Sequence, residues 1–198
     1  TYFADLNPKG KFDNLESVTN EVKLMMDPNA DPFAAPAPDA NAAPTKFGAS
    51  DVQDLNWVQL LNAYTCTECG RCTSACPANI TGKKLSPRKI MMDTRDRMEE
   101  VGKNMDANKG VFVPDNKTLL NDYITPEELW ACTSCNACVE ECPVNISPLS
   151  IIMDMRRYLV MEQSAAPMSL NAMMTNVENN GAPWQYSQQD RLNWKNEN

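Results

Sequence analysis

All eight cysteines of this 198-residue chain fall in two short runs with the same spacing. The first run is Cys66, Cys69, Cys72 and Cys76, followed by Pro77, and the second is Cys132, Cys135, Cys138 and Cys142, followed by Pro143. Each run reads C-x2-C-x2-C-x3-C-P. Because the two runs account for every cysteine, no thiol remains for a disulfide or a nucleophile elsewhere in the chain. The fold has to present two sulfur-rich loops.

The spacing favours iron–sulfur clusters over zinc. Three thiolates at short, equal intervals suit three corners of a cubane cluster, and this is the run found in bacterial ferredoxins. Structural zinc sites use pairs of C-x2-C and need neither a third cysteine at the same interval nor a Cys-Pro. A disulfide framework is disfavoured as well, since the cysteines are so evenly clustered. We therefore expect two [4Fe–4S] clusters and electron transfer rather than bond-making chemistry.

Composition excludes several other functions. The formal net charge is −8, so nucleic acid is not an expected partner. The chain has no histidine, which excludes a Rieske centre, a histidine-ligated haem and a histidine general base. No glycine-rich nucleotide-binding loop is present, and no apolar stretch is long enough to span a bilayer. We assign no catalytic residue to this chain.

Four segments are expected along the chain. Residues 1–27 form an N-terminal segment in which a short helix is predicted between Asp13 and Asp27. Residues 28–49 form a Pro/Ala-rich linker, which is either a tether or an arm lying across a partner subunit. Residues 50–163 form the domain that holds the clusters, and residues 164–198 form an extended C-terminal docking tail.

The domain is predicted to be mainly α-helical and built on a two-fold repeat. A helix is expected from Ser50 or Asp51 into the first run, and others begin at Ser86-Pro87, Thr125-Pro126 and Ser147-Pro148. The helix that begins at Ser86-Pro87 should end near Glu100, with residues 102–122 as a loop. An offset of 66 residues superposes the two cysteine runs, so each half reads helix, cluster loop, helix. No stretch alternates with period two, so strands are not expected.

At these residues the chain resembles the helical two-cluster ferredoxin domain. That domain occurs in the C subunit of heterodisulfide reductase, in iron–sulfur subunits of anaerobic glycerol-3-phosphate and lactate-oxidising systems, and in relatives of fumarate reductase and succinate dehydrogenase. The resemblance covers about residues 50–198 and is carried by Trp57, the run Cys66-Thr-Glu-Cys69-Gly-Arg-Cys72, Arg95, Cys142-Pro-Val-Asn-Ile, Met155-Arg-Arg-Tyr158, the segment Glu178–Trp184, Arg191 and Trp194.

The resemblance to two-cluster ferredoxins implies crossed ligation, in which the fourth cysteine of each run binds the other cluster. Carried over to this chain, the two ligand sets are Cys66, Cys69, Cys72 and Cys142 for cluster 1, and Cys132, Cys135, Cys138 and Cys76 for cluster 2.

The resemblance also implies partners and a location. It describes an electron-transfer subunit between a catalytic CCG-type or flavin subunit and a membrane quinone or haem b module, on the cytoplasmic side of a prokaryotic inner membrane. Residues 1–27 would then follow a membrane domain that some relatives carry. The alternatives are a subunit like that of succinate dehydrogenase or fumarate reductase, and a redox-silent metal scaffold. The first is disfavoured because the chain lacks the cysteines of a [2Fe–2S] domain and both runs are complete.

Other residues near the runs have two interpretations each. Trp130, just before Cys132, is expected to shield a cluster from water rather than relay electrons. The basic residues near the runs either offset cluster charge, form a docking face or are solvated; they are Arg71, Lys83, Lys84, Arg88, Lys89, Arg156 and Arg157. Methionines on the helices after the runs are expected to pack in the core.

Overall fold

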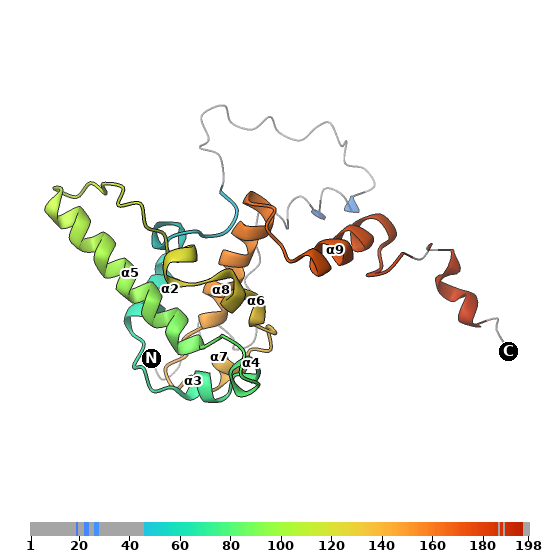
Figure 1. Cartoon of the computed structure of the whole chain (residues 1–198), viewed down its shortest axis with the longest axis horizontal. Helices are drawn as coiled ribbons and strands as arrows, with labels where there is room; N and C mark the ends of the chain where they lie inside the picture. The colour runs from blue at the N-terminus through green and yellow to red at the C-terminus, as the bar shows by residue number, and fades with distance from the viewer. Residues whose placement is uncertain are drawn as a thin grey trace, which may run out of the picture. The chain divides into compact units, whose positions relative to one another are not determined.

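The computed structural model of the chain describes residues 46–185, 187 and 189–195, together with isolated positions between 19 and 27. This part of the chain is mainly helical, as predicted, and contains no β-strand (Figure 1). Contacts divide the chain into two compact units, Thr1–Tyr158 and Leu159–Asn198. Most of the predicted segments 1–27 and 28–49, with most of the helix predicted after Asp13, lies outside the described residues.

The first unit holds both cysteine runs. Its helical elements are η1 (Val52–Asp54), α2 (Trp57–Tyr64), α3 (Arg71–Ser74), α4 (Pro77–Ile80), α5 (Pro87–Ala107), η2 (Leu119–Tyr123), α6 (Pro126–Ala131), α7 (Ala137–Glu140) and α8 (Pro148–Arg157), after which η3 (Tyr158–Glu162) begins. In the second unit, the residues predicted as a docking tail include a helix, α9 (Met168–Asn180), and a short 3-10 segment, η4 (Asp190–Lys195).

The three predicted Ser/Thr-Pro helix starts are confirmed. The Ser86 hydroxyl accepts a hydrogen bond from the Lys89 N–H at the start of α5, and Ser147 accepts one from the Ser150 N–H at the start of α8. Thr125 begins α6 with a capping box. Each cap satisfies an N–H group that the first turn leaves without a partner, and the proline lacks the N–H that would otherwise need one.

Two predicted helix boundaries were wrong. The helix expected from residue 50 or 51 is broken, because Asp51 caps the short η1 and Asn56 starts a new helix, α2, with its own capping box. The helix after Ser86 does not stop near Glu100 but continues to Ala107. Gly102 lies inside it, where a glycine costs only about 1 kcal/mol relative to alanine and does not end a helix by itself.

The core lies between α5 and α8. Both helices turn fully buried side chains toward it: Ile90, Met91 and Thr94 from α5, and Ile151, Ile152 and Met155 from α8. Helix α5 also contacts α2, α3 and η2, while α6 and α7 contact α8. The methionines predicted to pack in the core do so at Met91 and Met155. The cysteine loops are thus carried on one shared helical scaffold.

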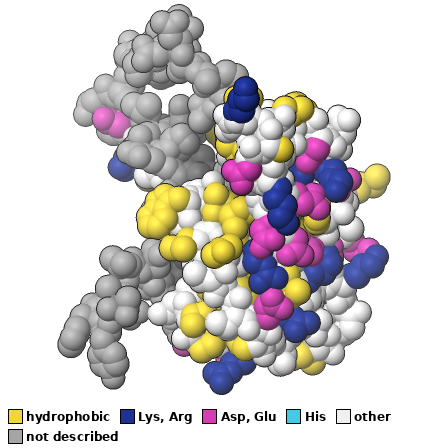
Figure 2. Space-filling model, turned by 90° about the vertical axis from the view of Figure 1, so that its left-hand side faces the viewer, with side chains coloured by type: hydrophobic (Ala, Val, Ile, Leu, Met, Phe, Trp, Pro, Cys, Tyr) yellow, Lys and Arg dark blue, Asp and Glu magenta, His cyan; other side chains and the backbone are white. Residues whose placement is uncertain are grey.

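The surface of the first unit mixes charge with exposed apolar side chains. The face seen in Figure 2 carries a band of acidic and basic side chains beside a hydrophobic patch. On α2, the large side chains of Trp57, Leu61 and Tyr64 lie at helical spacing and are all at least half exposed. Within the described residues, no helix combines the length and the apolar character that crossing a bilayer requires.

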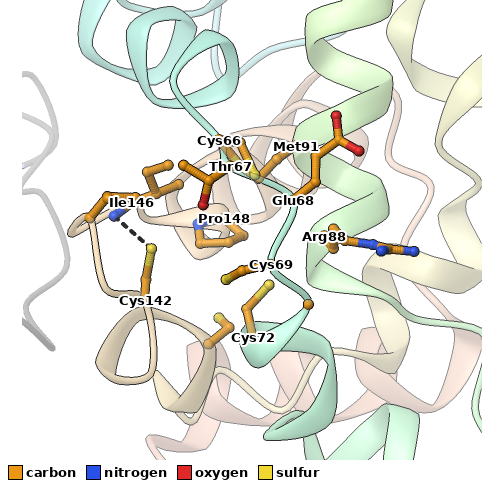
Figure 3. Close-up of a pocket in the computed structure, with 13 residues that line it drawn as sticks. Cys66, Thr67, Glu68, Cys69, Cys72, Arg88, Met91, Cys142, Ile146 and Pro148 are labelled. Carbon is orange, nitrogen blue, oxygen red and sulfur yellow. Dashed lines mark hydrogen bonds between the residues drawn. The ribbon is translucent and has the colours of Figure 1, made fainter.

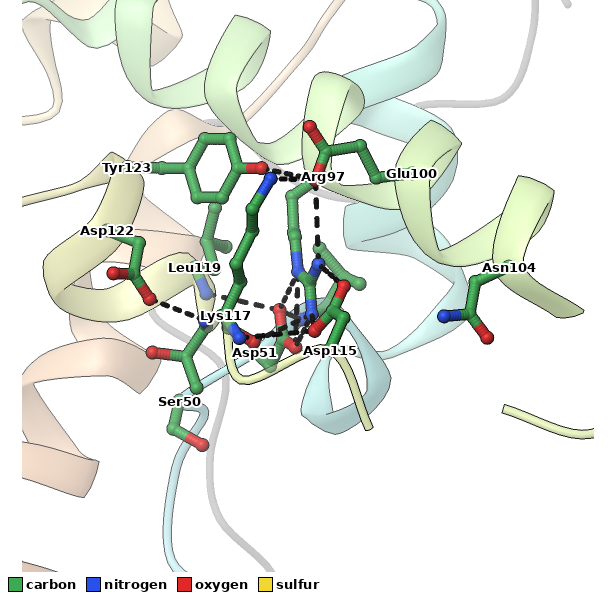
Figure 4. Close-up of polar contacts among 12 residues, drawn as sticks. Ser50, Asp51, Arg97, Glu100, Asn104, Asp115, Lys117, Leu119, Asp122 and Tyr123 are labelled. Carbon is green, nitrogen blue, oxygen red and sulfur yellow. Dashed lines mark hydrogen bonds and ion pairs between the residues drawn. The ribbon is translucent and has the colours of Figure 1, made fainter. Parts of the chain in front are cut away.

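A buried arginine joins three separate segments of the first unit (Figure 4). The Arg97 side chain is fully buried on α5 and donates hydrogen bonds to the carboxylates of Asp51 and Asp115 and to the Lys117 carbonyl oxygen. The hydrogen bonds that Arg97 donates to these carboxylates raise its pKa, and Arg97 in turn lowers the pKa of Asp115 to about 2. Arg97 therefore fastens the segment before η1 and the loop after α5 to the same helix.

We predict that Arg97→Met lowers the free energy of unfolding by about 3 kcal/mol, because it leaves Asp51 and Asp115 close together without their cation. Chemical denaturation of the anaerobic, cluster-loaded protein, followed by far-UV circular dichroism, measures this. Lys103→Met on the same helix is the matched control, since the Lys103 side chain is 78% exposed and should change stability by less than about 0.5 kcal/mol. Equal stability of the two variants would contradict the role given to Arg97.

Candidate metal centre

The two cysteine loops have the same backbone conformation. Glu68 and Ser134, which precede the second cysteine of each run, have φ angles of 56° and 55°. Gly70 and Asn136, which follow that cysteine, have φ angles of 79° and 62°. Glycine and asparagine tolerate this left-handed region, whereas glutamate and serine are held there by the surrounding loop. Such turns expose backbone N–H groups that can face an anionic cluster.

One pocket brings cysteines of both runs together (Figure 3). Its lining includes Cys66, Cys69 and Cys72 from the first loop and Cys142 from the second run, with Cys138 also at its wall. Apolar side chains complete the wall, among them Met91 and Ile146. The pocket encloses about 350 Å³, including its opening to solvent. Five thiols from loops far apart in sequence therefore surround one space.

The remaining cysteines lie near Cys138. Cys138 is buried against Val139 and Leu149, and the sulfur-bearing side chains of Cys72 and Cys132 pack on this cluster. Cys76 is also buried, and it interacts electrostatically with Cys132 and Cys138. Helix α3, which follows the first loop, contacts α7, which follows the second (Figure 1). The two halves of the repeat thus meet at their cysteines.

The protein opposes ionisation of several of these thiols. Burial raises the pKa of Cys138 to about 12 and also raises the pKa values of Cys72 and Cys132, with neighbouring cysteines adding to each shift. Cys135, at the surface, has a lowered pKa because it accepts a hydrogen bond from the Ala137 N–H. A cluster ligand has to be a thiolate. Crowded, buried thiols of this kind suit a site in which iron supplies the positive charge.

Backbone N–H groups already point at several of the sulfurs. The Ser134 N–H donates to Cys132 Sγ over 3.4 Å. The Ile146 N–H donates to Cys142 Sγ over 3.3 Å (Figure 3). Across the described residues, no three His, Cys, Asp or Glu side chains converge on a point suited to a single metal ion. In a cubane each thiolate binds a different iron, so its four ligands surround a volume rather than a point.

Trp130 and Arg156 border Cys132. The Arg156 guanidinium lies 4.9 Å from the centre of the Trp130 ring and donates to the carbonyl oxygens of Leu129 and Cys132. The Trp130 indole N–H is buried and has no acceptor among the described residues. An indole N–H can only donate, and a cluster or thiolate sulfur is an acceptor that would satisfy it. This side of the second loop therefore also fits an iron–sulfur group.

Four of the other basic residues named from the sequence fall into two groups. Arg88 lines the pocket of Figure 3 and directs its guanidinium away from the cysteines. Lys84, Lys89 and Arg157 instead form ion pairs with carboxylates away from the pocket lining. Sequence analysis missed the role of Glu68, which lies between two cysteines and pairs with Arg95 on α5 over 2.7 Å. The signal for this role in the sequence was a carboxylate between two cysteines of a C-x2-C step.

Comparison with known proteins gives the same answer as the geometry. A family model for the 4Fe-4S dicluster domain matches residues 65–146. The chain is 34% identical over 169 residues to an EtfAB:quinone oxidoreductase of Syntrophomonas wolfei, and 34% identical over 171 residues to a probable membrane-anchored ferredoxin of Chromohalobacter salexigens. These alignments cover 76% and 79% of this chain but only 24% and 25% of the relatives.

A third relative is the C subunit of a ferredoxin/F(420)H(2)-dependent CoB-CoM heterodisulfide reductase from Methanosarcina acetivorans. It is 34% identical over 108 residues, which cover 54% of this chain and 52% of the relative. This chain therefore spans a quarter to a half of the length of these three relatives. Residues 65–146 match the 4Fe-4S dicluster domain, and with its eight cysteines the chain carries two [4Fe–4S] clusters.

Proposed function

We propose that this chain relays electrons inside an oxidoreductase complex. It would connect a partner subunit of the CCG or flavin type to a quinone or haem module at a membrane, on the cytoplasmic side. A [4Fe–4S] cluster takes up and returns electrons without making or breaking substrate bonds. The observation that carries the proposal is the meeting of all eight cysteines in one unit, with no thiol to spare for other chemistry.

The chain's own residues support this role in two ways. Burial of Cys76 and Cys138 keeps water from part of the cysteine junction, while Cys69 and Cys135 are exposed and leave one edge of each loop open to a partner. The exposed side chains of Trp57, Leu61 and Tyr64 end two residues before Cys66, and an apolar surface of this kind is typical of a protein contact. We infer that the partner subunit approaches beside α2.

The membrane part of the proposal rests on the relatives. One is named for a quinone and another for a membrane anchor, and quinones are dissolved in the bilayer. Association through a partner, or through a segment before residue 1, is consistent with both names.

We also propose the crossed ligand sets. Cys66, Cys69, Cys72 and Cys142 would bind cluster 1, and Cys132, Cys135, Cys138 and Cys76 would bind cluster 2. Support comes from the pocket that the first four cysteines line together and from the electrostatic interactions of Cys76 with Cys132 and Cys138.

The relay is tested first by metal analysis and EPR of anaerobically purified protein. We expect about eight irons and about eight sulfides per chain, no EPR signal when oxidised, and interacting S = 1/2 signals after dithionite. Iron that does not change oxidation state, or zinc in its place, would leave only the structural-scaffold alternative.

Crossed ligation is tested with four cysteine-to-serine variants. We expect Cys142→Ser to leave the same EPR signal as Cys69→Ser, because both change cluster 1. Cys76→Ser should instead match Cys135→Ser, because both change cluster 2. Pairing of Cys76→Ser with Cys69→Ser, its neighbour in sequence, would show that each run binds its own cluster.

A further inference from the structure

The two halves of the repeat place an arginine at equivalent positions. Arg95 on α5 and Arg156 on α8 each lie eight residues after the proline that begins their helix. Each reaches the residue before the second cysteine of its own run, which is Glu68 in the first half and Ser134 in the second. Since Glu68 and Ser134 also share the same φ, the two contacts are copies of one arrangement.

The two copies differ in charge. The Arg95 guanidinium pairs with the Glu68 carboxylate over 2.7 Å and also lies 3.6 Å from an Asp96 carboxylate oxygen. Arg156 lies 3.5 Å from the Ser134 hydroxyl, and its other hydrogen bonds go to the carbonyl oxygens of Leu129 and Cys132. In the part of the chain that the structure describes, no carboxylate pairs with Arg156. The charge of Arg95 is compensated by a carboxylate, whereas that of Arg156 is not.

The uncompensated charge lies against the second cysteine run. Arg156 donates to the carbonyl oxygen of Cys132 itself and is half-buried over Trp130, so solvent screens it incompletely. Lys89 and Arg157 are half-buried but paired with carboxylates. Further charges near the runs are exposed, among them Arg71 and Arg88 near the first and Glu140 and Glu141 near the second. Their effects on the clusters pass largely through solvent and are weaker. The Arg95 and Arg156 environments therefore dominate the difference between the halves.

We propose that this difference separates the reduction potentials of the two clusters. Reduction adds one negative charge to a cluster, and a nearby unpaired cation favours that state. The cluster held by Cys132, Cys135 and Cys138 then has the higher potential, and the first electron to enter the chain resides on it. Glu68 and Arg156 are positioning residues that set this order. The inference rests on the relay and on the ligand sets proposed above.

The repeat provides the test, because the carboxylate of the first half can be removed and one can be introduced at the equivalent position of the second half. Glu68→Gln keeps the size of the side chain but removes the carboxylate from Arg95. Ser134→Glu gives Arg156 the carboxylate that Arg95 has, at a backbone conformation in which the first loop already holds a glutamate. Both variants are studied as cluster-loaded protein in an EPR-monitored redox titration, which gives the two midpoint potentials.

We expect Glu68→Gln to raise the lower of the two potentials and Ser134→Glu to lower the higher one. Each should change the distribution of one electron between the clusters about tenfold, which is about 59 mV. In the double variant the gap should close or reverse. The control is Asp106→Asn, which removes the same charge from an exposed site on α5 about 16 Å further along the helix than Arg95 and should move neither potential.

The proposal is overturned if Glu68→Gln moves the higher potential, or if it binds both clusters and moves neither. Because Glu68→Gln is an isosteric change at a partly exposed side chain, it decides the matter even where Ser134→Glu does not assemble its clusters. Clusters in the unsubstituted protein that cannot be reduced would contradict the proposed relay itself, a result distinct from unchanged potentials in the variants.

Discussion

The burial of cysteine sulfur at the junction of the two halves is the constraint on which the first unit depends. Cys138 is part of the core, and Cys72 and Cys132 pack against it. Burial raises the pKa values of these three thiols, and bound iron would compensate the charge of their thiolates. We therefore expect folding of this unit and cluster binding to be coupled, as in other small metal domains. The clusters would occupy interior space that a larger protein fills with more apolar side chains.

A second set of contacts stabilises the part of the first unit that has no cysteines. Arg97 joins Asp51 before η1, α5 and the loop carrying Asp115 through hydrogen bonds that metal does not influence directly. Gly48 is held close to α8: with a φ of +78°, it lies where a Cβ would fall 2.2 Å from the Asp154 carbonyl oxygen. These contacts fix the frame that carries the loops.

The two halves of the repeat are more alike in backbone conformation than in the chemistry of their side chains. Both loops use two left-handed residues at the same positions, and both end in a Cys-Pro. After Cys76 the chain forms α4, whereas after Cys142 it turns with Asn145 in the left-handed region. Glu68 has no counterpart carboxylate at Ser134. A duplicated scaffold thus presents two similar sites in unlike electrostatic surroundings, which is what a directional relay needs.

The sequence by itself determined the cofactor, the helical class and three helix starts. Those properties are local: the cysteine spacing lies within eleven residues, and each Ser or Thr cap satisfies an N–H three residues later. The break between η1 and α2 was missed because the apolar spacing runs through it, whereas Asn56 is an N-cap whose capping box with Gln59 starts α2. Only the tertiary structure decided which cysteines share a pocket and that Arg97 finds Asp115. It also decided that Glu68 pairs with Arg95, while no carboxylate of the described residues pairs with Arg156. Each of these depends on contacts between segments whose distance in space the local pattern does not encode.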